Sequence, residues 1–310
     1  MKAGGRDYFY NEKKSDRPGD ERNLLLNDRQ VKFEKYLTDA FSEKAVEFIN
    51  ESSQPFMMYL AYNAVHTPMQ ATDEDMAKFE GHPRQKLAAM TYALDRGVGT
   101  VIRGLKDSGK FDNTLIFFLS DNGGATTNQS SNYPLKGFKG NKFEGGHRVP
   151  YFVVWKNGIP AGKPYDGLVS SLDIFATAID AASISKTRNR LDGVSLLPYL
   201  KGKKGEPHKV LYWRKMDTRA IRSGDYKLII THGVDSVLYN IRRDPEEMNN
   251  LINKEPDLYR KLAKKLAKWE KNECIEPSWL EEGWRKITNR YHQQLMHNEI
   301  KTAQDLYKKK

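Results

Sequence analysis

The chain has one cysteine, Cys274, among its 310 residues. A disulfide needs two cysteines, so the sequence excludes an internal disulfide framework. Long apolar runs are also missing: the longest, residues 56–62, is far shorter than the roughly 20 residues that cross a bilayer as a helix. We therefore predict no membrane span. The hydrophobic share of 38% is low but sufficient for a core.

The sequence has fewer acidic than basic residues. The 51 Lys and Arg residues outnumber the 40 Asp and Glu residues, which gives a net charge of +11. Such an excess favours polyanionic partners such as sulfated glycans, nucleic acid or anionic lipid. Runs of lysine at 201–204, 261–268 and 308–310 are simply explained as solvated faces and a tail. No motif interleaves basic and aromatic residues, so we predict no nucleic-acid partner.

Hydrophobic periodicity predicts alternating helices and strands. Apolar residues recur at helical spacing over 31–50 and 83–109, the second run being interrupted by Gly97 and Gly99. Short runs rich in β-branched and aromatic residues predict buried strands at 55–62, 115–119 and 151–155.

The carboxyl-terminal third has a different pattern. A change of composition at 201–207 predicts a boundary. Short strands joined by turns are expected after it, at 210–214, 219–222, 226–231 and 237–241. An amphipathic helix should begin at Pro256. Residues from Cys274 onwards are expected to be helical and loosely packed.

Polar side chains follow the strand at 115–119 directly. Asp121 and Asn122 offer a carboxylate and an amide oxygen, which are hard donors that suit Ca²⁺ or Mg²⁺. The carboxyl end of a strand is also where open α/β sheets bind ligands. The same Asp-Asn-Gly-Gly sequence is common in ordinary turns, so taken alone it leaves both interpretations open.

The residues around this turn resemble the sulfatase family. The order is a strand, S-D-N-G-G, L-K-G-F-K-G at 135–140, E-G-G-H-R-V-P at 144–150, and a second strand. A further match is N-A-V-H-T-P-M-Q at 63–70, and together the matches span roughly residues 30–255. This pattern is similar to that of the formylglycine-dependent, arylsulfatase-type enzymes of the alkaline-phosphatase superfamily.

The resemblance implies a fold and a division into domains. Residues 1–204 would form part of an α/β domain, with an alkaline-phosphatase-like mixed sheet that is flanked by helices and incomplete at its N-terminal side. Residues 205–310 would form a small C-terminal subdomain with an antiparallel sheet, a helix and a tail. The segment L-Y-N-I-R-R-D-P-E-E-M-N-N-L at 238–251 also matches, and we expect it to be structural.

The resemblance further implies roles for single residues. Asp121 and Asn122 would ligate the cation, Ca²⁺ first and Mg²⁺ as the alternative. Lys139 would bind the sulfate and the leaving oxygen, and Lys136 is the second choice for that role. His66 would contact the sulfate or help to protonate the departing alcohol.

Two other residues of the E-G-G-H-R-V-P segment are assigned by the same comparison. Glu144 is expected to hold the turn together. His147 would face either the substrate or the surface. The substrate implied is a sulfated carbohydrate or an aryl sulfate ester, and the family suggests a periplasmic or secreted protein.

The nucleophile motif of the family is missing. Its formylglycine is made from a Cys or Ser within C/S-x-P/A-x-R, and the surroundings of Cys274 lack the arginine. The family's early paired aspartates are missing too. We therefore expect a C-terminal portion of a sulfatase that hydrolyses nothing by itself. The alternatives are a noncatalytic remnant that binds sulfated polyanions through His66 and Lys139, and a phosphoester or phosphonate hydrolase of the same superfamily.

Overall fold

The computed structural model describes residues 2–3, 7–9, 24–27, 29–184, 190–274 and 282–308. It divides into two compact units, unit 1 (Met1–Thr114) and unit 2 (Leu115–Lys310). The boundary predicted at 204/205 stays a prediction. None of the helices in the described ranges has both the length and the apolar character that crossing a membrane requires.

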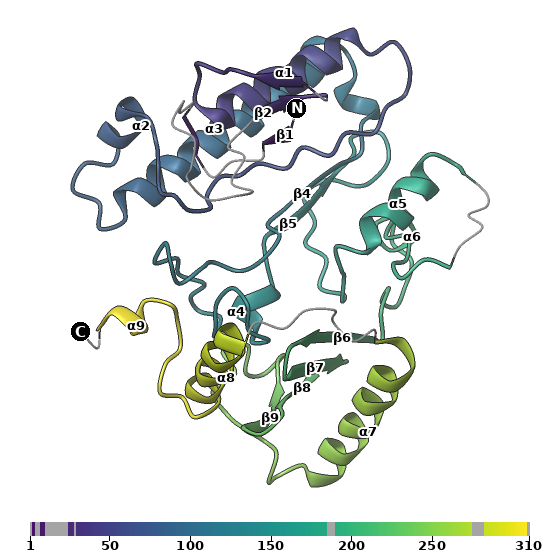
Figure 1. The fold of residues 1–310 in the computed structure, drawn as a ribbon. Helices are drawn as coiled ribbons and strands as arrows, with labels where there is room; N and C mark the ends of the chain where they lie inside the picture. The colour runs from purple at the N-terminus through teal and green to yellow at the C-terminus, as the bar shows by residue number, and fades with distance from the viewer. Residues whose placement is uncertain are drawn as a thin grey trace. The chain divides into compact units, whose positions relative to one another are not determined.

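Two long helices, α1 (Leu37–Glu51) and α3 (Gln85–Asp107), lie side by side in unit 1 (Figure 1). Helix α3 is continuous, so the expected interruption at Gly97 and Gly99 is wrong. Glycine is needed at Gly97 because a Cβ there would lie 2.6 Å from the Oγ of Ser42 on α1. The glycine therefore lets the two helices approach, and tertiary packing offsets its low helix propensity.

The remaining elements of unit 1 are short. They are the helix α2 (Asp73–Ala77), a 3₁₀ turn (Phe111–Asn113), and three antiparallel strands in the order β1–β2–β3 (Lys2–Ala3, Leu24–Leu26, Arg29–Val31). A buried core forms between α1, α3 and the chain around Tyr8, with Met90 and Ala93 fully enclosed.

The buried strand predicted at 55–62 is not present. The segment has the alternation of an extended chain, with Leu60 and Tyr62 packed on the core of unit 1. Its other side is open, since Met57 is 70% and Tyr59 90% exposed. A strand needs a hydrogen-bonded neighbour, and in the described residues no segment pairs with this one.

In unit 2, two predicted strands form an antiparallel pair. Strand β4 (Ile116–Leu119) pairs with β5 (Tyr151–Val154), and Phe118 lies opposite Phe152. Both of these aromatic side chains are partly open to solvent, at 39% and 59% exposed. Helices α5 (Asp173–Ala181) and α6 (Leu197–Leu200) follow in the sequence.

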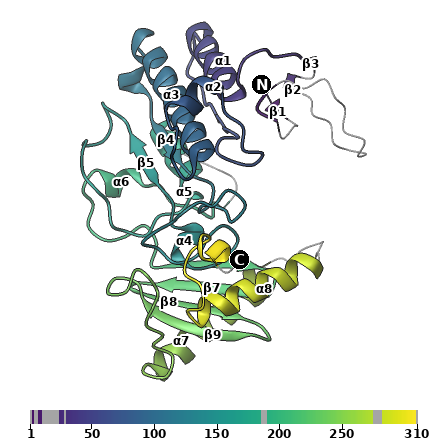
Figure 2. The same cartoon turned by 90° about the vertical axis from the view of Figure 1, so that its left-hand side faces the viewer.

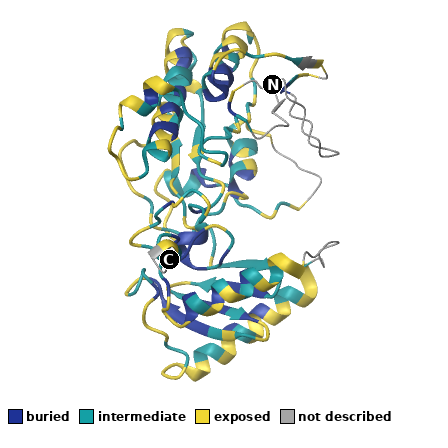
Figure 3. Cartoon of the chain, turned by 60° about the vertical axis from the view of Figure 1, so that its left-hand side comes forward, coloured by how far each residue is buried: buried dark blue, intermediate teal, exposed yellow. Residues whose placement is uncertain are grey.

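The four short strands predicted after residue 205 are confirmed. Strands β6 to β9 form one antiparallel sheet in sequence order (Val210–Lys215, Thr218–Ser223, Tyr226–Thr231, Asp235–Asn240). Strands β7, β8 and β9 each carry buried residues, whereas every residue of β6 is half-buried (Figure 3). Its side chains alternate between two faces, as the pleat requires.

Each face of this sheet is covered. Helix α7 (Pro256–Glu273) packs Leu262 and Leu266 on the face that carries Leu228. Helix α8 (Glu282–Met296) packs Leu295 on the opposite face, which carries Ile229 (Figure 2). Residues 282–308 are therefore largely helical, as expected, but they are not loosely packed. A last short helix, α9 (Asp305–Lys308), ends the described chain.

Candidate functional site

The turn at 120–124 packs directly on helix α4 (Glu144–His147). The Gly123 amide donates a hydrogen bond to the Gly146 carbonyl at 3.1 Å. A Cβ on Gly123 would lie only 1.8 Å from the Gly145 carbonyl oxygen, so no other residue fits there. The D-N-G-G and E-G-G-H segments, which are separate in the sequence, thus form one rigid backbone assembly.

Asp121 and Asn122 keep free oxygen atoms on this turn. Asp121 is exposed and has no hydrogen bond or ion pair to any described residue. Asn122 donates through Nδ2 to the Gly123 carbonyl at 2.9 Å, which leaves its Oδ1 without a protein donor in the described chain. These atoms suit a hard cation. The described residues hold no cluster of three or more His, Cys, Asp or Glu for a metal, so the pair supplies only part of a ligand set.

The lysine turn at 136–140 is tied to the same assembly. The Lys139 amide donates to the Gly124 carbonyl at 2.9 Å. Asn132 accepts from the Gly124 amide at 2.8 Å and donates to the Gly137 carbonyl at 3.0 Å, so it bridges the two turns. The side chain of Lys139 is exposed and has no partner among the described residues. The structure therefore brings Asp121, Asn122 and Lys139 onto one framework.

Lys136, the second choice for the sulfate-binding lysine, is fully buried. Its ammonium donates to the Glu247 carbonyl at 2.9 Å and to Asn298, and it lies 5.1 Å from the ring centre of Phe143. Burial lowers its pKa to about 8. These contacts hold Lys136 in the core of unit 2, whereas the side chain of Lys139 is exposed.

A buried charge cluster supports helix α4, and the sequence pattern does not predict it. The Lys227 ammonium lies 2.8 Å from Glu144 Oε1 and 2.9 Å from Glu247 Oε1, and none of the three side chains exceeds 5% exposed. Glu247 also accepts from the Glu144 amide at 2.6 Å. Glu144 thus holds the turn, as expected, but through partners on β8 and in the 238–251 segment.

The two carboxyl groups of this cluster titrate differently. Burial raises the pKa of Glu247 to about 7, although Lys227 opposes the rise. Burial acts in the same direction on Glu144, but there the attraction of Lys227 prevails and holds the pKa at about 2. Lys227 therefore stabilises the charged form of Glu144, whereas burial disfavours the charged form of Glu247.

His147 is packed against the sheet. Its ring stacks on Trp213 with the centroids 4.5 Å apart, and its Nε2–H donates to the Lys142 carbonyl at 3.1 Å. Burial lowers its pKa to about 3, so the imidazole is neutral at pH 7. Its expected contact with substrate stays a prediction.

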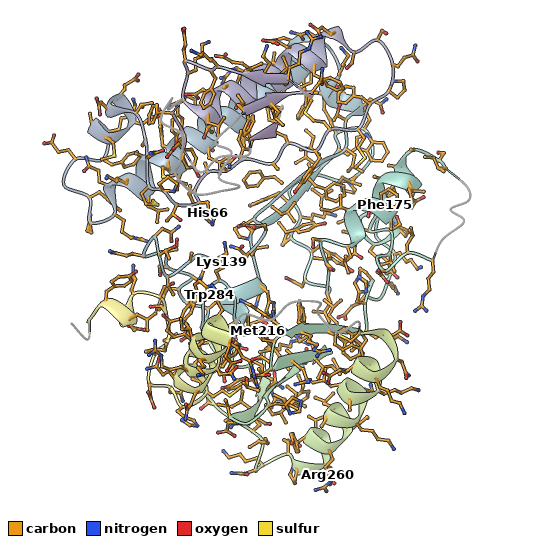
Figure 4. The ribbon with its side chains drawn as sticks, viewed as in Figure 1. His66, Lys139, Phe175, Met216, Arg260 and Trp284 are labelled. Atoms are coloured by element: carbon orange, nitrogen blue, oxygen red, sulfur yellow. The ribbon has the colours of Figure 1, made fainter. Side chains whose placement is uncertain are left out.

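His66 belongs to unit 1, whereas the residues above belong to unit 2 (Figure 4). It is exposed, and its Nδ1–H donates to the Thr67 carbonyl at 2.7 Å. This bond fixes the tautomer, so that Nε2 of the neutral ring carries the lone pair. The Tyr8 hydroxyl donates to the His66 carbonyl at 2.8 Å and steadies the backbone at this position.

Comparisons with known proteins agree on one family. A family model described as Sulfatase matches residues 1–184, and one described as N-sulphoglucosamine sulphohydrolase, C-terminal, matches residues 139–272. The chain is 39% identical over 201 residues to the uncharacterized sulfatase YdeN of Escherichia coli K12, covering 62% of the chain and 36% of that protein. It is 32% identical over 202 residues to the N-acetylgalactosamine-6-sulfatase of Canis lupus familiaris, covering 63% and 38%.

Solved structures extend the similarity over most of the chain. The crystal structure of Ps i-CgsB matches with a TM-score of 0.79 and 35% identity, covering 91% of this chain and 65% of that one. The same protein in complex with k-i-k-neocarrahexaose matches with a TM-score of 0.78. The mixed α/β fold expected from the sequence is confirmed. The chain spans 36% and 38% of the length of the two curated relatives.

Proposed function

Because the chain belongs to the sulfatase family, we propose that the whole protein hydrolyses sulfate esters of sulfated carbohydrates. One observation carries this proposal. The turns bearing Asp121, Asn122 and Lys139 are held together by backbone hydrogen bonds, yet the Asp121 carboxylate, the Asn122 Oδ1 and the Lys139 ammonium have no protein partners in the described residues. Polar groups held in place but left unpaired are suited to a ligand.

Charge complementarity defines the role of Lys139. A sulfate ester presents a tetrahedral oxyanion, and its leaving oxygen gains negative charge as the S–O ester bond breaks. The ammonium of Lys139 would bind the sulfate oxygens and stabilise the charge that develops on the leaving oxygen. Lys136 cannot do this without leaving Glu247 and Asn298.

Asp121 and Asn122 would hold the divalent cation, with Ca²⁺ preferred over Mg²⁺ because Ca²⁺ accepts carboxylate and amide oxygens in irregular coordination geometries. A cation bound there supplies positive charge near the sulfate. The other ligands would come from residues outside this chain.

His66 would serve the departing alcohol. Its Nδ1–H is occupied by the Thr67 carbonyl, so Nε2 is the atom that can carry a transferable proton. When protonated, the imidazolium would donate that proton to the leaving oxygen.

We also propose that the nucleophile, a formylglycine, lies outside these 310 residues, because no C/S-x-P/A-x-R motif occurs in them. The chain alone would then bind sulfated carbohydrate weakly and release no sulfate. The alternative is a noncatalytic protein that binds sulfated polyanions. The exposed and unpaired Lys139 of unit 2 makes it the second candidate.

The test compares sulfate release and binding in matched variants. Lys139→Met should abolish binding of a sulfated disaccharide while leaving the melting temperature unchanged, because the side chain is exposed and unpaired. Lys163→Met, which removes another exposed lysine of unit 2, is the control and should change neither. Equal binding by the Lys139 variant and the parent would overturn the assignment.

A further inference from the structure

Several lysines of unit 2 have no acidic partner in the described residues, and three of them, Lys139, Lys142 and Lys215, lie close enough to influence one another. Lys139 is exposed, and Lys142 and Lys215 are half-buried. In the part of the chain that the structure describes, none of them makes an ion pair or a side-chain hydrogen bond. Lys215 is the last residue of strand β6, directly before Met216, which Figure 4 labels.

The lysine turn and the end of β6 face each other. A Cβ on Gly140 would lie 2.8 Å from the Lys215 ammonium, so that ammonium covers the residue next to Lys139. The Lys142 carbonyl is bound by His147, whose ring stacks on Trp213. Trp213 and Lys215 are two residues apart on one strand and therefore lie on the same side of it.

These cations repel one another in a partly desolvated place. Burial, followed by repulsion from Lys215 and Lys227, lowers the pKa of Lys142 to about 8. Burial and then Lys139 lower the pKa of Lys215. Helix α8 adds His292, whose pKa burial lowers to about 4, so it is neutral and brings no compensating charge.

The acidic groups nearby are already paired. Glu144 holds Lys227 at 2.8 Å. Asp217, on the turn after β6, accepts from Arg285 at 2.7 Å and from Asn289 at 2.7 Å. Lys142 and Lys215 lose part of their hydration and gain no counter-ion in return. A bound oxyanion would relieve the repulsion and satisfy the ammonium donors together.

We propose that Lys142 and Lys215 form a second anion subsite beside Lys139, which binds a sulfate group of the carbohydrate other than the one removed. This inference rests on the proposed function. It specifies the substrate as a carbohydrate with at least two sulfate groups on neighbouring sugar positions. Lys139 would hold the sulfate that is hydrolysed, and the second subsite would select the polysulfated chain.

The experiment measures dissociation constants by calorimetry for the 310-residue chain. The probes are a disaccharide with one sulfate ester, the same disaccharide with two, and inorganic sulfate. Lys142→Met and Lys215→Met should each weaken binding of the disulfated probe about tenfold, the loss of one charge-assisted contact. Binding of the monosulfated probe and of inorganic sulfate should stay within about twofold, as in the control Lys163→Met.

The melting temperature of each variant shows whether weaker binding is due to misfolding. Removing Lys142 or Lys215 relieves repulsion, so neither substitution should lower the melting temperature. Equal losses for both disaccharides, or no loss for either, would overturn the subsite. Sulfate release by the whole protein separates the two proposals. Release that does not depend on Lys142 with a disulfated substrate contradicts the subsite alone. If the chain binds the disulfated probe more tightly than the monosulfated one, but the whole protein releases no sulfate, the result contradicts only the proposed hydrolysis.

Discussion

Replacing Lys227 by Met should destabilise unit 2 strongly. The ammonium of Lys227 is wholly buried and contacts both Glu144 and Glu247 at under 3 Å. Met keeps most of the side-chain volume but removes the charge, so two buried carboxyl groups lose their shared partner. Helix α4 begins at Glu144, and Gly123 of the D-N-G-G turn is bound to that helix.

The magnitude follows from the titration of Glu144. Its pKa is held at about 2, against an ordinary value of 4.5. Each pKa unit of this kind is worth about 1.4 kcal/mol, so the charges around Glu144, Lys227 first among them, contribute on the order of 3 kcal/mol at pH 7 after the cost of burial is subtracted. Breaking a buried ion pair by removing one partner typically costs about 3–5 kcal/mol, which agrees.

The sign of the pH dependence is fixed by the depressed pKa of Glu144. A depressed carboxyl pKa adds stability above pH 4.5, and that stability is lost as the pH falls from about 4.5 towards 2. The difference between Lys227→Met and the parent should therefore be largest near neutral pH and shrink in acid. Glu247 adds to the difference at neutral pH, because burial raises its pKa and Lys227, which opposes that rise, is absent from the variant.

Urea denaturation of the 310-residue chain at pH 7 and pH 4 gives the free energies of unfolding. Lys163→Met serves as the control for loss of one positive charge. The triple variant Lys227→Met, Glu144→Gln, Glu247→Gln should recover at least half of the loss, because it leaves no buried carboxylate unpaired. A loss under about 1 kcal/mol at pH 7, or an equal loss at both pH values, would refute the reasoning.

Three other outcomes are expected. Gly123→Ala should cost more than about 2 kcal/mol, since its Cβ would lie 1.8 Å from the Gly145 carbonyl, whereas Gly283→Ala, with open space at its Cβ, should be neutral or stabilising in denaturation curves. Lys142→Met should raise the free energy of unfolding at pH 7 by up to about 3 kcal/mol, because a pKa lowered to about 8 destabilises the fold below that pH; the gain should vanish above about pH 10, and its absence at pH 7 would contradict the burial of the charge. Asp121→Asn should weaken Ca²⁺ binding at least tenfold in calorimetry of the whole protein without changing the melting temperature, and unchanged affinity would remove Asp121 from the ligand set.

Local pattern was enough for the elements whose periodicity is strong. Strand β8 was predicted at its observed bounds, and helix α7 begins at Pro256 as expected. The segment at 55–62 has the same strand-like composition. A strand also needs a hydrogen-bonded neighbour, and the residues of the segment do not reveal whether one is present. Gly97 reads as a helix breaker until the contact with Ser42 on the facing helix is known.

The candidate site divides in the same way. Asp121, Asn122 and Lys139 were found because short motifs carry them. Lys227 and Glu247 were not recognised as a cluster, since the amide of Glu144 reaches Glu247 across 103 residues of sequence. The pairing of Lys142 with Lys215 likewise depends on how the lysine turn docks on β6. Long-range contacts of this kind follow from the packing of the sheet and cannot be derived from spacing.

Sulfate release from a disulfated carbohydrate, by the protein expressed from its complete reading frame, tests the central claim most directly. The account predicts that this reading frame encodes C/S-x-P/A-x-R and that release occurs in the parent and in Lys163→Met. Release should be lost in Lys139→Met, whose fold should remain intact by its melting temperature. Undiminished release by the Lys139 variant, or no release by a folded parent with cation present, would contradict the account.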